Sequence, residues 1–442
     1  MKRFGKASLS LALAAAVLSA CSGNNNDSQG SGNTAGSSGA SKGSSGEVVN
    51  LTFWGGVPAE SGPQEIVDTW NKEHPNIQVN YVRYVNDDSG NLKLDTALVS
   101  GQSVDIFANY TKPLLVKRVS AGSALDLSAF KDYDIDDKMG AGAKEWAIED
   151  KYFAMPTKRN MHFVWLNKDA LDEAGLPVPT DWTLADVERY AKALKTDSRW
   201  GYAEFPFWRD IVTFDGSLAV QGYVKADGTS NLGAPVVGQA LQLEYDMMHT
   251  SKVSPPVSLI ESTKMNMNAE FLGGKLAIFT AGEWIFRDAN NTKDYPREFT
   301  IAFAPLPRVA EGQDDFRYLG GLGDAISINA RSEHQEEAWA FLKWYADGGM
   351  LPQASGGRIP ASKDADQSKA LELLLGDNKD KYDTESLQRI LANERPTFQV
   401  TLPQEVIDIR REEFDKYYIK AQSLEQTLAN VVKRHNEYLK RQ

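Results

Sequence analysis

The segment VNLTFWGGVP, residues 49–58, decides the fold of this chain. Val49, Leu51 and Phe53 fall on alternate positions, and this period of two predicts a β-strand. Two glycines and a proline within residues 55–58 end the strand. The fold class then depends on the elements that come after this strand and on whether the pattern repeats.

Helices and strands alternate after this opening segment. Pro63 suits the first turn of a helix, and an apolar helical face runs on to Trp70. Residues 77–81 return to a period of two, a helix is expected around residues 92–99, and residues 104–107 form a short strand. Strand, helix, strand, helix, strand predicts a parallel sheet with helices on its faces.

The middle and the end of the chain continue in the same α/β style. Thr183 and Asp186 form a capping box, which predicts the start of a helix. A strong amphipathic helix is expected over Glu336–Tyr345, and the chain from Gln404 onward is charged and mostly helical. Four more strands are expected, at residues 163–166, 276–279, 299–303 and 325–328.

Residues 1–20 have the pattern of a secretory signal peptide. The uncharged run at residues 7–20 is too short for a membrane-spanning helix, which needs about 20 apolar residues. It closes on Leu18-Ser19-Ala20-Cys21, which resembles the lipobox of bacterial lipoproteins, where the cysteine sulfur receives a diacylglycerol. The alternative is an ordinary signal with a chance cysteine. Cys21 is the one cysteine of the 442 residues, so a disulfide framework is excluded.

Residues 21–46 have the composition of a tether. Serine, glycine and asparagine dominate, so the segment cannot bury enough apolar surface to offset the entropy of ordering. A Gly/Ser chain of this length spans on the order of 25–30 Å on average. The folded body then starts near Glu47, and the net charge of −12 argues against nucleic acid as a partner.

A set of short motifs after the tether is similar to the extracellular solute-binding proteins of bacterial ABC importers, in the sugar-binding branch (family 1) that includes maltose-binding protein. The motifs are weak one by one, and their order and separation carry the resemblance. They are LTFWG at 51–55, DIF at 105–107, YFAMP at 152–156, WLNKD at 165–169, GLP at 175–177, DWT at 181–183, FLGGK at 271–275, GEW at 282–284, APLP at 304–307, GG at 320–321 and AWAFLKW at 338–344.

The resemblance implies a two-lobed periplasmic-binding-protein-like fold of type II, with mixed sheets flanked by helices and a ligand cleft between the lobes. Lobe I would comprise residues 47–156 and 305–349, and lobe II residues 157–304 and 350–442. The implied function is capture of a sugar or oligosaccharide by lobe closure and delivery to a membrane permease. The implied protein is a lipid-anchored monomer on the outer face of a single-membrane bacterium, without cofactor or metal.

Some candidate ligand contacts follow strand ends, where ligands collect in open α/β sheets. The resemblance implies others: polar contacts at Asn109 and Asn160, and aromatic contacts at Tyr110, at Phe207 or Trp208, and at Trp284. A flat aromatic ring buries the face of a sugar, and amide, carboxylate or guanidinium groups satisfy its hydroxyls. Glu60 and Asp324 are either such contacts or solvated charges, and Arg358 either faces the cleft or forms a local salt bridge. Trp70, Trp339 and Trp344 lie on helical stripes and are assigned to the core. The candidates are Trp54, Glu60, Asn109, Tyr110, Asn160, Phe207, Trp208, Glu283, Trp284, Gly320, Gly321, Asp324 and Arg358.

Motifs for catalysis or metal binding are weak in this sequence. Asp132, Asp134 and Asp136 imitate a calcium loop, but Asp137 stands where glycine is needed and Ala143 where glutamate is needed. A glycosidase needs only two carboxylates placed by the fold, so motifs do not exclude one. A tethered, exported carbohydrate-active enzyme, a glycosidase or a lyase, is therefore the alternative to the binding protein.

Overall fold

The computed structural model describes residues 48–442 except 206–210, 314–315 and 393–395. The predicted signal peptide, Cys21 and the tether lie outside the described residues, and so do the candidates Phe207 and Trp208. None of the described helices combines the length and the apolar character that crossing a bilayer requires.

The described strands form a mixed sheet in the order β2-β1-β3-β8-β4-β6-β5, with β7 beside β4 and β9 beside β8. β1 is parallel to β2 and β3, as the opening segment predicts, whereas β8 is antiparallel to β3 and to β4. The strands are β1 Val49–Gly55, β2 Ile77–Arg83, β3 Ile106–Asn109, β4 Met155–Asn167, β5 Trp200–Glu204, β6 Leu276–Gly282, β7 Ile301–Ala304, β8 Tyr318–Ile328 and β9 Thr397–Phe398.

β4 and β8 are much longer than the sequence pattern indicates. They pair from Met155 with Ile326 to Met161 with Gly320, and beyond this point β4 pairs with β6 and β7 instead. The predictions of residues 163–166 and 325–328 were therefore too short. Pro156 and the polar residues after it hide the start of β4, and the glycines of β8 contribute no side chains to a period-two pattern.

Helices cover the sheet on both sides. The predicted capping box is present: Asp186 N–H donates to Thr183 Oγ1 and Thr183 N–H donates to the Asp186 carboxylate. The α-helices are α1 Pro63–Glu73, α2 Asp88–Ser100, α3 Lys112–Ser120, α4 Ile135–Met139, α5 Lys168–Glu173, α6 Leu184–Leu194, α7 Ile211–Gln221, α8 Pro235–His249, α9 Val257–Thr263, α10 Met267–Leu272, α11 Ile285–Asn290, α12 Gln335–Trp344, α13 Gln367–Leu375, α14 Thr384–Ala392, α15 Gln404–Tyr418 and α16 Leu424–Leu439.

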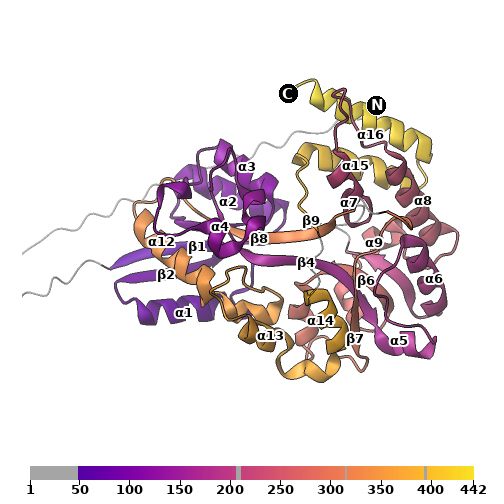
Figure 1. The fold of residues 1–442 in the computed structure, drawn as a ribbon, viewed down its shortest axis with the longest axis horizontal. Helices are drawn as coiled ribbons and strands as arrows, with labels where there is room; N and C mark the ends of the chain where they lie inside the picture. The colour runs from indigo at the N-terminus through magenta and orange to yellow at the C-terminus, as the bar shows by residue number, and fades with distance from the viewer. Residues whose placement is uncertain (1–47, 206–210, 314–315, 393–395) are drawn as a thin grey trace, which may run out of the picture. The chain divides into compact units, whose positions relative to one another are not determined.

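The buried residues form separate cores joined by the two long strands. One core contains Trp70 and Trp339, as predicted, together with residues of β1, β3 and β8; Trp344 is only partly buried at its edge. A second contains Trp165 and Phe303 with residues of β6 and α11. We call these parts lobe I and lobe II. Figure 1 shows β4 and β8 side by side between the two parts. The lobe boundaries at residues 156, 305 and 349 stay predictions.

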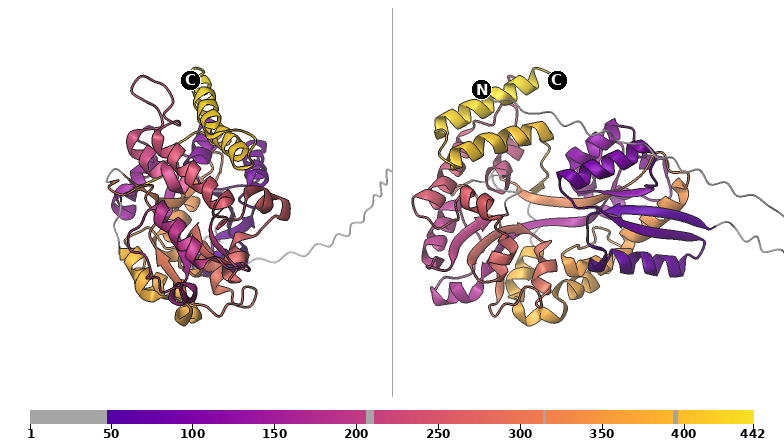
Figure 2. Two further views of the ribbon diagram at one scale, coloured as in Figure 1. Left: turned by 90° about the vertical axis from the view of Figure 1, so that its right-hand side faces the viewer. Right: turned by 180° about the vertical axis from the view of Figure 1, so that it is seen from behind.

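The C-terminal helices extend lobe II. Leu241 of α8, Val406 and Phe414 of α15 and Val431 of α16 share one apolar cluster. Figure 2 shows α15 and α16 packed side by side on the outside of this lobe. This packing directs the first turns of α15 toward β4 and β8, which brings a charged helix beside the junction of the lobes.

Candidate ligand-binding site

A pocket lies over β4 and β8 where the two lobes meet. Its lining brings together three of the candidate residues, Tyr110, Asn160 and Gly320, from three separate parts of the sequence. Lobe I contributes the start of α3, and lobe II contributes the two residues directly after β9 and the first turns of α15. The lining residues are Tyr110, Thr111, Lys112, Pro113, Asn160, His162, Leu319, Gly320, Gln399, Val400, Gln404, Ile407 and Arg411.

Tyr110 directly follows β3, and its ring is held from the neighbouring strand end. The N–H of Gly56 donates a hydrogen bond of 2.6 Å to the Tyr110 hydroxyl. A Cβ on Gly56 would lie 3.0 Å from the ring, so the glycine allows this close approach. Burial, followed by the nearby Asp324 carboxylate, raises the pKa of Tyr110 to about 12. The phenol is therefore neutral at physiological pH and can donate or accept hydrogen bonds.

Asn160 lies on β4 opposite the glycine-rich part of β8. It pairs with Gly321, and a Cβ on Gly323 would lie 2.6 Å from the Asn160 amide nitrogen. Only a residue without a side chain leaves room for the amide at this place. Gly321 has φ of +93°, a conformation that glycine adopts without strain. The amide of Asn160 is therefore held against bare backbone at the base of the pocket.

Glu283, Asp324 and Arg358 come together, but as partners of one another. The Lys158 ammonium forms an ion pair with Glu283 and lies 3.7 Å from Asp324, and Arg358 Nε donates a 2.9 Å hydrogen bond to Asp324. All four side chains are at most 12% exposed. Two cations and two carboxylates balance here, as burial of charge requires. Asp324 is therefore not a solvated charge, and Arg358 forms the local salt bridge.

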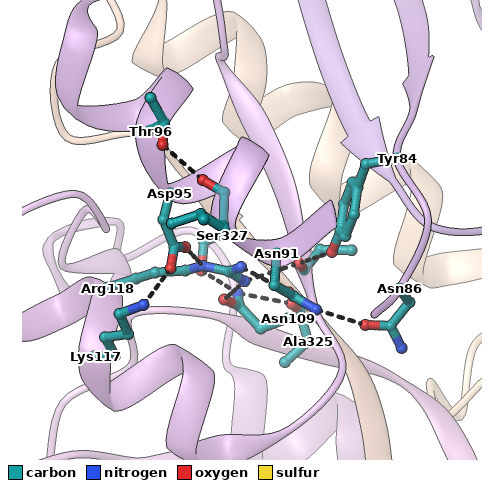
Figure 3. A network of polar contacts seen from close by, with 12 residues as sticks. Tyr84, Asn86, Asn91, Asp95, Thr96, Asn109, Lys117, Arg118, Ala325 and Ser327 are labelled. Carbon is teal, nitrogen blue, oxygen red and sulfur yellow. Dashed lines mark hydrogen bonds and ion pairs between the residues drawn. The ribbon is translucent and has the colours of Figure 1, made fainter. Parts of the chain in front are cut away.

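Asn109, a predicted ligand contact, is fully buried in a network around Arg118 (Figure 3). Its amide nitrogen donates to the carbonyl of Ala325 and to the Ser327 hydroxyl, at 3.1 and 2.9 Å, and its amide oxygen accepts from Arg118 at 2.9 Å. Arg118 also pairs with Asp95 at 2.8 Å. Both ends of the amide are used inside lobe I, and ligand contact by Asn109 stays a prediction. The network instead anchors the end of β3, directly before Tyr110.

The two tryptophan candidates in the described part of the chain differ in burial. Trp54 is 4% exposed and packs with Tyr84 and Phe107, so its ring is in the core of lobe I and cannot stack on a ligand in this structure. Trp284 is partly exposed, with its ring 5.2 Å from His162 in an edge-on arrangement. A Cβ on Gly282 would lie 1.9 Å from the Trp284 ring, so this glycine makes room for the indole. Glu60 is an exposed residue.

Several pocket residues had no signal in the sequence. His162 lies in the stretch of β4 that no period-two pattern marks, and Gln399, Gln404 and Arg411 come from the C-terminal segment. Burial, and then the charge of Lys158, lowers the pKa of His162 to about 3, so the imidazole is neutral near pH 7. In the described ranges, no group of three or more histidine, cysteine or acidic residues is arranged to hold a metal ion.

The pocket supplies hydrogen-bonding groups beside the phenol of Tyr110. Amides from Asn160 and Gln399 face a lining that also contains apolar Leu319 and Ile407. Such a lining suits a small, polar ligand with an apolar face. Because the buried carboxylates Glu283 and Asp324 have cationic partners, they are not arranged as a free acid and base.

Comparisons with known proteins agree with this architecture. Residues 55–347, more than half of the chain, match the family described as bacterial extracellular solute-binding protein. An uncharacterized lipoprotein of Streptomyces antibioticus is 23% identical over 295 residues, which cover 63% of this chain and 62% of that protein. An arabinooligosaccharide-binding protein of Halalkalibacterium halodurans is 24% identical over 295 residues, covering 64% and 63%. The alignments therefore span less than two thirds of either relative's length.

The fold is also that of a solved structure. An ABC substrate-binding protein from Listeria monocytogenes, in complex with cycloalternan, superposes with a TM-score of 0.72 at 21% identity, covering 89% of this chain and 99% of that chain. The two-lobed α/β architecture with a mixed sheet, expected from the sequence motifs, is thereby confirmed.

Proposed function

Because this chain belongs to the family of bacterial extracellular solute-binding proteins, we propose that it is the ligand-binding component of an ABC importer. Its ligand is a sugar or an oligosaccharide, which it captures between its lobes and delivers to the membrane permease. The observation that carries the proposal is the pocket at the lobe junction, which combines a phenol, amides and bare glycine backbone from both lobes.

Capture by closure follows from where the pocket lies. A ligand that binds the open and the closed form with equal affinity does not shift the equilibrium between them. Closure therefore requires ligand contacts that exist only when the lobes approach each other. Tyr110 and Lys112 stand on lobe I, and Gln404 and Arg411 stand on α15 of lobe II. A ligand that touches both walls stabilises the closed form by those additional contacts.

Binding without chemical change is part of the proposal. The relative from Halalkalibacterium halodurans and the protein solved with cycloalternan are both named as binding proteins. The ion pairs of Glu283 and Asp324 with basic side chains support the same interpretation, because a glycosidase needs one free carboxylate and one carboxylic acid.

A lipid on Cys21 would hold the protein at the outer face of the cell membrane. The signal pattern at residues 1–20 and the tether at 21–46 support this, as does the relative named as a lipoprotein. We propose that the protein acts as a tethered monomer in a single-membrane bacterium. The tether would keep the folded body near the permease while either lobe can dock.

Thermal unfolding of the full chain against a panel of neutral mono- and oligosaccharides tests this function. A ligand at 100 times its dissociation constant adds about 2.7 kcal/mol to stability, which gives a clear upward shift of the melting temperature. Small-angle scattering should show a more compact particle with the same sugar, and chromatography of the incubated sugar should show no products. A panel without any binder would argue against a sugar ligand, and released products would favour the enzyme.

A further inference from the structure

Glu145 lies beside the pocket on a well-anchored turn of lobe I. It belongs to a short 3-10 helix, Ala141–Trp146. The indole N–H of Trp146 donates a 2.9 Å hydrogen bond to the carbonyl of Leu322 on β8. The Lys112 ammonium donates to the carbonyls of Glu145 and Ala147. The backbone around Glu145 is thus fixed to β8 and to α3, and this restricts the directions that its side chain can take.

The carboxylate of Glu145 faces the glycine-rich stretch of β8. A Cβ placed on Gly321 would lie 3.2 Å from Glu145 Oε2 and 3.5 Å from Gln399 Nε2. Gly321 pairs with Asn160 on β4. Glu145, Gln399 and Asn160 therefore surround the same bare segment of backbone, and two of these three line the pocket.

One oxygen of this carboxylate lacks a partner. Oε2 is buried and accepts no hydrogen bond from any described residue. A buried acceptor without a donor is costly, and the cost is larger when the acceptor is charged. Burial raises the pKa of Glu145, although Arg317 and Lys112 lower it. The site is therefore short of one hydrogen-bond donor at the junction of the lobes.

We propose that Glu145 accepts a hydrogen bond from a ligand hydroxyl and that this contact selects neutral sugars over sugars that carry a carboxylate. The inference rests on the proposed function. A sugar hydroxyl is the donor that Oε2 lacks, whereas a second carboxylate can only accept and is repelled. The Lys112 ammonium donates to the carbonyls of Glu145 and Ala147 and gives no hydrogen bond to Oε2.

The test compares the full wild-type chain with Glu145→Gln and with the control Glu149→Gln, an exposed glutamate in the same loop. The probes are matched neutral and acidic oligosaccharides, galactotriose and trigalacturonate, together with maltotriose, xylotriose and mannotriose. Calorimetric titration gives affinities, and thermal unfolding checks that each variant folds. The wild type should prefer the neutral member of the matched pair at least tenfold. Glu145→Gln should weaken binding of the neutral sugar about tenfold, the usual value of a hydrogen bond to a charged acceptor.

The pH dependence separates ligand contact from a structural role. A hydroxyl donor favours the ionised carboxylate, so wild-type affinity should rise as the pH increases from about 4.5 to 7. The groups that face Glu145 are Lys112 and Arg317, which stay charged over this range, and His162 in the pocket stays neutral. Glu145→Gln should show no such rise, and Glu149→Gln should keep it.

Each outcome has one meaning. A wild type that binds a neutral sugar, with the same affinity and pH slope in Glu145→Gln, overturns the inference and leaves the proposed function standing. Preference of the wild type for the acidic sugar also overturns it. A folded wild type that binds none of the sugars overturns both.

Discussion

Replacing Lys158 by Met should lower the free energy of unfolding by about 3–5 kcal/mol. The side chains of Lys158 and Glu283 are 4% and 0% exposed, and the Asp324 carboxylate lies 3.7 Å from the same ammonium. Methionine fills a similar volume without a charge. The variant therefore leaves a buried carboxylate without its counter-ion at the point where the lobes join.

The magnitude is set by the distances and the burial. Unit charges 3.7 Å apart attract by about 4 kcal/mol at an effective dielectric constant of about 20. Removing the ammonium regains its own desolvation cost, but the desolvation cost of Glu283 stays uncompensated. A loss of about 3–5 kcal/mol is large against a typical total stability of about 5–15 kcal/mol.

Urea unfolding of the full chain, followed by tryptophan fluorescence at pH 7, measures the effect. Lys293→Met, at an exposed position, should change stability by less than about 0.5 kcal/mol. The double variant Lys158→Met/Glu283→Gln removes both charges and keeps an oxygen for the N–H of Met161, which donates to Glu283 at 2.9 Å. It should recover about 2 kcal/mol of the loss. A single variant within about 1 kcal/mol of wild type, or a double variant less stable than the single, would refute the reasoning.

Three further predictions concern the ligand, the pH range and the anchor. Trp284→Ala should weaken binding of the sugar found by screening at least tenfold, about 1.4 kcal/mol by calorimetry, and unchanged affinity would remove Trp284 as a stacking platform. Burial alone would raise the pKa of Glu413. Hydrogen bonds to its carboxylate, those from Lys416 and Arg434 first, instead lower the pKa to about 2. The stability that Glu413 contributes is thus present above about pH 4.5 and is lost as the pH falls toward 2. In Glu413→Gln the free energy of unfolding at pH 7 should fall by about 1–2 kcal/mol, and the decrease in stability between pH 4.5 and 2 should be smaller than in the wild type. Cys21→Ser should release the protein from cells into the medium with sugar affinity intact; a released protein that no longer binds would show that the tether is not passive.

The surroundings of the candidate residues were only partly predictable, and the unpredicted contacts have a common cause. Asn109 and Trp54 were placed correctly at the ends of strands, but their side chains turn into lobe I, toward Arg118 and Phe107. A strand end exposes a residue to a cleft or to a core depending on the helix that packs beside it. Which helix packs there depends on contacts between residues far apart in the sequence, and the local hydrophobic pattern does not contain this information.

The C-terminal wall of the pocket was missed for a related reason. Gln404 and Arg411 lie on a charged helix that has the pattern of a solvated surface element. Packing of Val406 and Phe414 of this helix against α7 and α8 turns its polar first turns toward β4. Amphipathic spacing indicates that a helix has a buried face, but it does not say which neighbour the opposite face approaches.

The sequence by itself determined those features that depend on near neighbours along the chain. The period-two strand at Val49–Gly55, the capping box at Thr183 and the buried faces of Trp70 and Trp339 follow from alternation, turn chemistry and burial within a few residues. Tertiary structure alone decided the ion pair of Lys158 with Glu283, 125 positions apart, and the donor-poor oxygen of Glu145 against Gly321. Partners so distant in sequence meet only through strand register and lobe packing, since a charge by itself does not specify which opposite charge it will meet.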